Sequence, residues 1–182
     1  MKVSFELSNK DLRFFRERLR QVRTGKGAQD ESVVIHGAAK LAKEALETGT
    51  PDFVRERIGI LEKLIAMLTD LEWRLEGADR TRILDALAYF VDPDDLIPDK
   101  VPGLGYLDDA IMIELVAREL VHEIAAYDDF CAFRKSRPRS EATAKLEARR
   151  KALHARMRRR RRREREIRRS RRTPSSSRIR LW

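Results

Sequence analysis

The spacing of apolar residues indicates helices along most of this chain. Apolar side chains recur at steps of three and four residues, and most Gly and Pro residues fall between the periodic stretches. No stretch alternates with the period of two that is typical of a half-buried strand, and no internal repeat is evident. The pattern therefore predicts an all-α fold, a compact helical bundle of about five helices.

The predicted helices are separated by turn-forming residues. They are expected at residues 9–22, 31–46, 51–75, 79–90 and 108–127. Thr50 is the expected N-cap of the third helix, with Pro51 in its first turn, where no amide donor is required. Asp108 is the expected N-cap of the fifth helix, which could extend to Phe133.

The C-terminal part of the chain has a different character. Leu146, Leu153 and Met157 are almost the only apolar positions of a further helical segment that leads into a run of arginines. Because such a helix has little to bury, we expect this tail to be partly helical or disordered. The sequence therefore predicts two parts, an acidic helical domain at residues 1–135 and an arginine-rich C-terminal tail at residues 136–182.

The charge is divided unevenly between these parts. Residues 134–182 hold 22 Lys and Arg against four Glu and no Asp, a net charge of +18. Residues 1–133 hold 18 Lys and Arg against 26 Asp and Glu, a net charge of −8. A dense block of like charge repels itself and cannot join a core, so this asymmetry is typical of a folded body with an interaction tail.

Several features favour a soluble cytoplasmic protein. Cys131 is the sole cysteine, which excludes an internal disulfide and any site with several cysteine ligands. The apolar start of the chain is short and is followed by a charged stretch, unlike a secretory signal. No uninterrupted apolar run has the length of a membrane span. We expect a cytoplasmic location, with a peripheral position at the inner face of the membrane as the alternative.

Residues 86–110 combine an aromatic pair with prolines, glycines and aspartates in a distinctive order. The order is Tyr-Phe-x-x-Pro-x-Asp-Leu-Ile-Pro-Asp, followed by Pro-x-x-Gly-x-x-Asp-Asp. In this respect the segment resembles the YkvA-like family, a bacterial helical domain of unknown function. The resemblance implies a helical domain and no known reaction. The positions that carry the resemblance are Tyr89, Phe90, Pro93, Asp95, Leu96, Ile97, Pro98, Asp99, Pro102, Gly105, Asp108 and Asp109.

The same segment contains a cluster of carboxylates. The six residues are Asp92, Asp94, Asp95, Asp99, Asp108 and Asp109. Oxygen ligands of this kind suit calcium or magnesium. The calcium-loop pattern is absent, however, because the sixth position counted from Asp92 is Ile97 rather than Gly. A structural role in capping helices and setting turns is favoured, so no metal and no cofactor are expected.

Catalytic motifs are incomplete. His122 and Glu123 begin like a zinc-protease helix, but Ala126 occupies the position of the second histidine. Gly103 and Gly105 lack the third glycine of a dinucleotide-binding loop. We therefore expect no enzymatic activity, and a metal-dependent hydrolase that uses the aspartate cluster is the least favoured function.

The tail has the composition of a phosphate-binding arm, because guanidinium groups pair bidentately with phosphate oxygens. RNA or DNA is the favoured partner, and an anionic membrane surface is the alternative. Ile167 is the only apolar anchor in the basic run, which disfavours the membrane. A solvated tail that folds back on the acidic body also stands as an alternative. The candidate nucleic-acid-binding residues are Arg158, Arg159, Arg160, Arg161, Arg162, Arg163, Arg165, Arg168, Arg169, Arg171 and Arg172.

The predicted function is thus a non-enzymatic interaction module that its basic tail tethers to nucleic acid. The acidic body would then contact a protein partner that the sequence does not identify.

Overall fold

The computed structural model describes the following parts of the chain: residues 13, 17, 30–47, 49–91, 106–136 and 143–172, with side chains up to residue 170 in the last range. The predicted first helix lies outside these residues, apart from Arg13 and Glu17, which are helical. The described residues are almost entirely helical and contain no strand, so the all-α prediction is confirmed.

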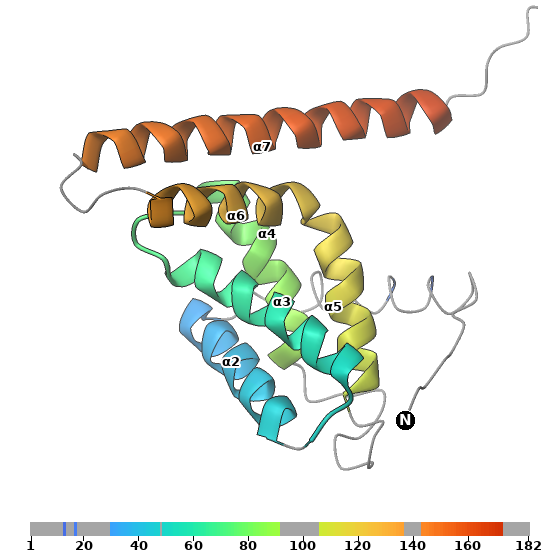
Figure 1. Ribbon diagram of the computed structural model, residues 1–182. Coiled ribbons are helices and arrows are strands. Elements are labelled where there is room, and N and C mark those ends of the chain that lie inside the picture. Colours follow the sequence, from blue (N-terminus) through green and yellow to red (C-terminus); the bar gives the residue numbers. More distant parts are fainter. Residues whose placement is uncertain are drawn as a thin grey trace, which may run out of the picture. The chain divides into compact units, whose positions relative to one another are not determined.

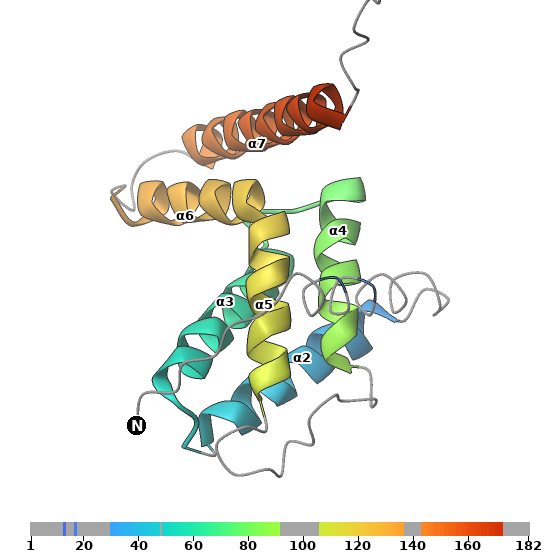
Figure 2. The same ribbon diagram turned by 90° about the vertical axis from the view of Figure 1, so that its right-hand side faces the viewer.

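The described part of the chain forms six α-helices and one short 3-10 helix (Figures 1 and 2). They are α2 (Glu31–Glu47), α3 (Asp52–Thr69), α4 (Gly77–Leu87), η1 (Ala88–Val91), α5 (Leu107–Glu119), α6 (Val121–Ser136) and α7 (Thr143–Arg172). The chain divides into two compact units, residues 1–121 and residues 122–182, so that α6 is grouped with α7. The boundary near residue 135 predicted from the sequence concerns independent folding and stays a prediction.

In the first unit, α3 packs against α2, α4 and α5 (Figure 2). The apolar stripe of α3 is buried because its residues recur on one face, and Ile58, Leu61 and Leu64 have no exposed surface. The facing residues of α2 are small, with Ala38 and Ala45 fully buried, which lets the two helix backbones approach closely. These two helices agree with the sequence pattern that predicted them.

The start of α3 differs from the prediction. Thr50 does not cap this helix, because its hydroxyl donates instead to the carbonyl oxygen of Ala45 at 2.9 Å. Pro51 is the N-cap residue, and its carbonyl oxygen accepts the amides of Val54 and Arg55 at 3.0 and 3.1 Å. The Thr50 side chain therefore closes the end of α2 rather than the start of α3.

The end of α3 comes earlier than the predicted continuation to Leu75. The helix ends at Thr69, and the next residue, Asp70, turns the chain. The Asp70 carboxylate accepts the amides of Glu72 at 2.9 Å and Trp73 at 3.1 Å, which competes with continued helical bonding. Trp73 and Leu75 are still buried, so their apolar signal reflects burial in a turn rather than helix.

The predicted fifth helix is two helices. The chain leaves α-helical geometry at Leu120, whose φ and ψ are −103° and 17°, and α6 begins at the next residue. The N-cap of α5 is Tyr106, so the prediction that Asp108 caps this helix is wrong. Asp108 and Asp109 lie in the first turn of α5, where the positive end of the helix dipole favours carboxylates.

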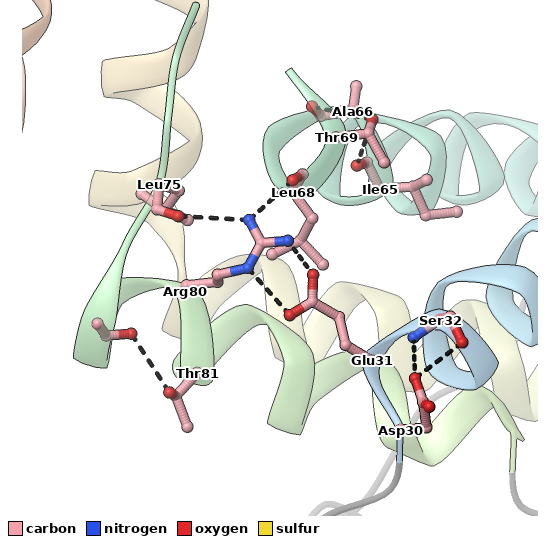
Figure 3. A network of polar contacts seen from close by, with 11 residues as sticks. Asp30, Glu31, Ser32, Ile65, Ala66, Leu68, Thr69, Leu75, Arg80 and Thr81 are labelled. Carbon is pink, nitrogen blue, oxygen red and sulfur yellow. Dashed lines mark hydrogen bonds and ion pairs between the residues drawn. The ribbon is translucent and has the colours of Figure 1, made fainter. Parts of the chain in front are cut away.

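An arginine that the sequence analysis did not single out joins several elements of the first unit (Figure 3). Arg80 of α4 donates from Nε to Glu31 of α2 at 3.1 Å, and its Nη2 pairs with the second oxygen of that carboxylate. Its Nη1 donates to the carbonyl oxygens of Leu68 at 2.8 Å and Leu75 at 3.3 Å. The hydrogen bond from Arg80 lowers the pKa of Glu31, and the same bond raises the pKa of Arg80. One guanidinium thus ties α2 and the end of α3 to α4.

Candidate nucleic-acid interface

The second unit is a helical hairpin in which α7 runs antiparallel to α6 (Figures 1 and 2). Polar contacts between side chains of the two helices agree with this direction. Arg161 Nη1 lies 2.6 Å from Glu123 Oε1, and His122 Nε2 lies 3.0 Å from Glu164 Oε2. Arg156 pairs with Asp129, one turn and a half further along α6. Later residues of α6 therefore pair with earlier residues of α7.

Aromatic contacts continue the hairpin toward its connection. The guanidinium of Arg149 on α7 lies 5.5 Å from the ring centroid of Phe133 on α6. Within α6, the guanidinium of Arg134 lies 5.3 Å from the ring of Phe130, which is fully buried. Both distances suit a cation–π interaction.

The tail helix buries more than its apolar content suggested. Leu146, Leu153 and Met157 are each at most 3% exposed, and Arg150 is 9% exposed. With Arg161 these residues recur at steps of four, three, four and four, so they form one face of α7. We call this face, with Glu164 one turn on, the inner face.

The ion pair between Glu123 and Arg161 is the most enclosed of those in the hairpin. The Glu123 side chain has no exposed surface, and that of Arg161 is 16% exposed. A buried carboxylate is costly unless it is paired and hydrogen-bonded. Arg161, a candidate phosphate ligand in the sequence analysis, is therefore committed to α6.

The other candidate arginines whose side chains the structure describes are exposed. Within α7, Arg162 forms an ion pair with Glu166 at 3.1 Å, and Arg168 forms one with Glu164 at 2.6 Å. Glu164 has its pKa lowered chiefly by the hydrogen bond from Arg168, with a smaller contribution from His122. The side chains of Arg171 and Arg172 lie outside the described residues, although their backbone is helical. The exposed candidate residues are Arg158, Arg159, Arg160, Arg162, Arg163, Arg165, Arg168 and Arg169.

The described residues of the family-like motif lie in the interior of the first unit. Tyr89 and Phe90 are in η1, with ring centroids 5.2 Å apart in an edge-to-face arrangement. Asp108 and Asp109 are 2% and 4% exposed in the first turn of α5. The positions between these two pairs lie outside the described residues: Pro93, Asp95, Leu96, Ile97, Pro98, Asp99, Pro102 and Gly105.

The sequence model of a family described as "Protein of unknown function (DUF1232)" matches residues 80–115. Over these residues the chain is similar to the DUF1232 family. It is the family that the resemblance to YkvA-like proteins indicated. In the same comparisons no curated protein and no solved structure matched the chain.

The DUF1232 segment begins at Arg80, the residue that joins α2, α3 and α4, and ends within α5. Several charged residues in or next to it are buried, whereas Asp85 is exposed. Asp79, just before the segment, and Asp108 and Asp109 within it are buried. The segment thus supplies the last helices of the first unit rather than an exposed cluster of reactive groups among its described residues.

Two further findings concern the described residues alone. They contain no group of three or more His, Cys, Asp and Glu residues that could hold a metal ion, but the aspartates at 92, 94, 95 and 99 lie outside them. No helix among them is both long and apolar enough to cross a membrane.

Sequence reasoning missed the ion pairs that hold the hairpin, because their partners lie 27 to 42 residues apart in the chain. The inner face did leave a signal. Leu146, Leu153 and Met157 are spaced by seven and four residues, as in a helix packed along one face. The sequence analysis named these three residues, but the many arginines around them led it to expect that the helix has little to bury.

Proposed function

We propose that the chain is a non-enzymatic interaction module that binds nucleic acid through α7, by contacts to phosphates that do not read bases. The observation that carries this proposal is the exposed arginine surface on a helix whose opposite side is anchored to α6. Anchoring matters because a helix that is already ordered loses less conformational entropy on binding than a disordered arm does.

The charge of α7 supports a polyanionic ligand. Residues 143–172 contain 16 Lys and Arg against three Glu. Guanidinium groups that displace counterions from a nucleic acid bind it strongly at low salt and weakly at high salt. No Phe, Tyr or Trp occurs in α7, and His154 is its one imidazole, so the helix has no extended platform on which successive bases could stack.

An anionic membrane is the weaker candidate. A helix that lies in a membrane surface needs an apolar face opposite its basic residues. Within the described part of α7, Ile167 is the one large apolar residue that is exposed, at 43% of its surface. A single residue of this kind gives little apolar area to bury, so phosphates of a nucleic acid are favoured over those of a lipid surface.

The test compares these ligands on the intact chain. Affinity is measured by fluorescence anisotropy for unrelated DNA and RNA sequences, and by cosedimentation for vesicles of mixed anionic and zwitterionic phospholipid, over a range of salt. We expect similar affinities for unrelated sequences and a linear fall of log affinity with log salt. Binding to vesicles without binding to nucleic acid would contradict the proposal and favour the membrane.

The matched variants alter the surface and not the fold. Replacing Arg159, Arg163 and Arg165 by Gln removes three exposed positive charges from α7 and should weaken binding to every sequence to a similar degree. Replacing Lys40, Lys43 and Arg55 by Gln removes three exposed charges from α2 and α3 and should leave binding nearly unchanged. Equal losses from both sets would show that net charge rather than α7 determines binding.

A further inference from the structure

Arginines of α7 differ in whether they form an ion pair with a carboxylate of α6. Successive residues of an α-helix are about 100° apart, so positions two residues before and after Arg161 lie about 160° around the helix from it. These positions are Arg159 and Arg163, both exposed. Arg159 and Arg163 form what we call the outer arginine set.

The second set is held by α6. Arg156 pairs with Asp129, and Arg161 pairs with the buried Glu123. A guanidinium in such a pair must give up its carboxylate before it can bind a phosphate. For Arg161 this exchange would leave a carboxylate of zero exposure without that partner, which is strongly unfavourable. The outer and paired arginines therefore have different roles.

The geometry of α7 also discriminates among nucleic acids. The helix spans 30 residues, a length of about 45 Å, and an α-helix with its side chains is about 10–12 Å across. The major groove of B-form DNA is about 12 Å wide and admits a helix. The major groove of duplex RNA is deep and narrow. Single strands are recognised mainly by stacking on aromatic residues, and α7 has no Phe, Tyr or Trp.

We propose that the ligand is double-stranded DNA, which α7 contacts as an already formed helix through the outer arginine set, while Arg156 and Arg161 are positioning residues that hold α7 on α6. This inference rests on the proposed function, since it specifies the ligand and the surface of the same site. The helix would enter the groove with its outer face, because α6 occupies the opposite side. Arg–phosphate contacts from both edges of this face would orient it without specifying a sequence.

The experiment uses the intact chain and two double variants that remove the same charge from the same helix. Arg159→Gln with Arg163→Gln alters the outer set, and Arg156→Gln with Arg161→Gln alters the paired set. Affinity for a short mixed-sequence DNA duplex is measured over a range of salt. Each phosphate contact contributes about 0.9 to the slope of log affinity against log salt, so the outer variant should flatten the slope by about 1.8.

The paired variant should leave that slope almost unchanged and should lower the melting temperature, whereas the outer variant should leave the melting temperature unchanged. If the paired variant loses helix content, the single variants Arg156→Gln and Arg159→Gln give the same comparison, with an expected slope difference of about 0.9. The Arg156 side chain is 34% exposed, so its loss is tolerable for the fold. Equal changes of slope in the two sets would overturn the assignment of roles.

Two further measurements test the ligand and the preformed helix. The same sequence as duplex RNA and as single-stranded DNA should bind more weakly than duplex DNA, and the far-ultraviolet circular dichroism of the protein should change little when DNA is added. Equal affinity for the three nucleic acids, or a large gain of helix on binding, would overturn this inference while the proposed function stands. Failure to bind any of the three would overturn both.

Discussion

Replacing Arg161 by Gln tests whether the arginine tail belongs to the folded structure. The substitution removes the guanidinium that lies 2.6 Å from Glu123, whose side chain has no exposed surface. Gln keeps a polar side chain and good helix propensity but carries no charge, so the carboxylate loses this positively charged partner. A buried charge that has lost its ionic partner is costly because water cannot replace that partner.

The expected loss of stability is large for a residue in an arginine run. Removing one partner of a buried ion pair lowers stability by about 3–5 kcal/mol. Because the Arg161 side chain is still 16% exposed, we expect the lower end of this range, about 3 kcal/mol. The neighbouring substitution Arg162→Gln breaks a pair with side chains 84% and 63% exposed, which is worth about 0.3 kcal/mol. For a chain of this length, these values correspond to falls in melting temperature of about 6–12 °C and about 1 °C.

The assay is a thermal melt of the intact chain followed by circular dichroism. The variant Glu123→Gln with Arg161→Gln should be more stable than Arg161→Gln alone, because it no longer buries a carboxylate that has lost this partner. If Arg161→Gln melts at the same temperature as Arg162→Gln, the pair does not hold α7 on α6. The distinction between paired and outer arginines would then fail with it.

Three further predictions concern the first unit and are checked by melting the intact chain. Gly37→Ala should lower the melting temperature, because its Cβ would lie 2.9 Å from both methyl groups of Val91. The Cβ of Gly59→Ala meets nothing within 4 Å, so this substitution should stabilise α3 by about 0.5–1 kcal/mol. A higher melting temperature for Gly37→Ala than for Gly59→Ala would contradict the close approach of α2 to η1. Arg80→Lys keeps the positive charge but should lower the stability of the fold by about 1–2 kcal/mol, because Lys lacks the planar guanidinium that bonds a carboxylate and two carbonyl oxygens at once. An unchanged melting temperature would contradict this role of the guanidinium. Glu31→Gln should lower the melting temperature by its full amount at pH values above the ordinary pKa of a glutamate. This decrease should become smaller as the pH falls through the lowered pKa that Glu31 has in the folded state. A decrease that does not depend on pH would exclude the ion pair as its cause.

The helices were predictable where burial repeats along one face of a continuous segment. The stripe in α3 is of this kind, and α2 and α3 lie close to where the periodicity placed them. The ends were less predictable because they depend on competing hydrogen bonds. The Thr50 hydroxyl could cap the helix after it or close the helix before it, and it donates to Ala45. The break between α5 and α6 at Leu120 could not be predicted in this way, because no Gly or Pro lies next to it.

The arginine tail shows the limit of an interpretation based on composition. Charge density distinguished the arginine-rich segment from the rest of the chain, but it could not separate Arg161 from Arg159 or Arg163, which have the same side chain. Their difference depends on Glu123, which lies 38 residues from Arg161 in the chain. Only the packing of α7 beside α6 shows which guanidinium groups form ion pairs with α6 and which are exposed to solvent.

The central claim, that α7 binds nucleic acid, is tested most directly by crosslinking in living cells that express the chain at its native level. Protein recovered under denaturing conditions is assayed for covalently attached, nuclease-sensitive nucleic acid. The account predicts attachment to many unrelated sequences, and a strong decrease when Arg159, Arg163 and Arg165 are replaced by Gln. Recovery of no nucleic acid, or of equal amounts with the variant, would contradict it.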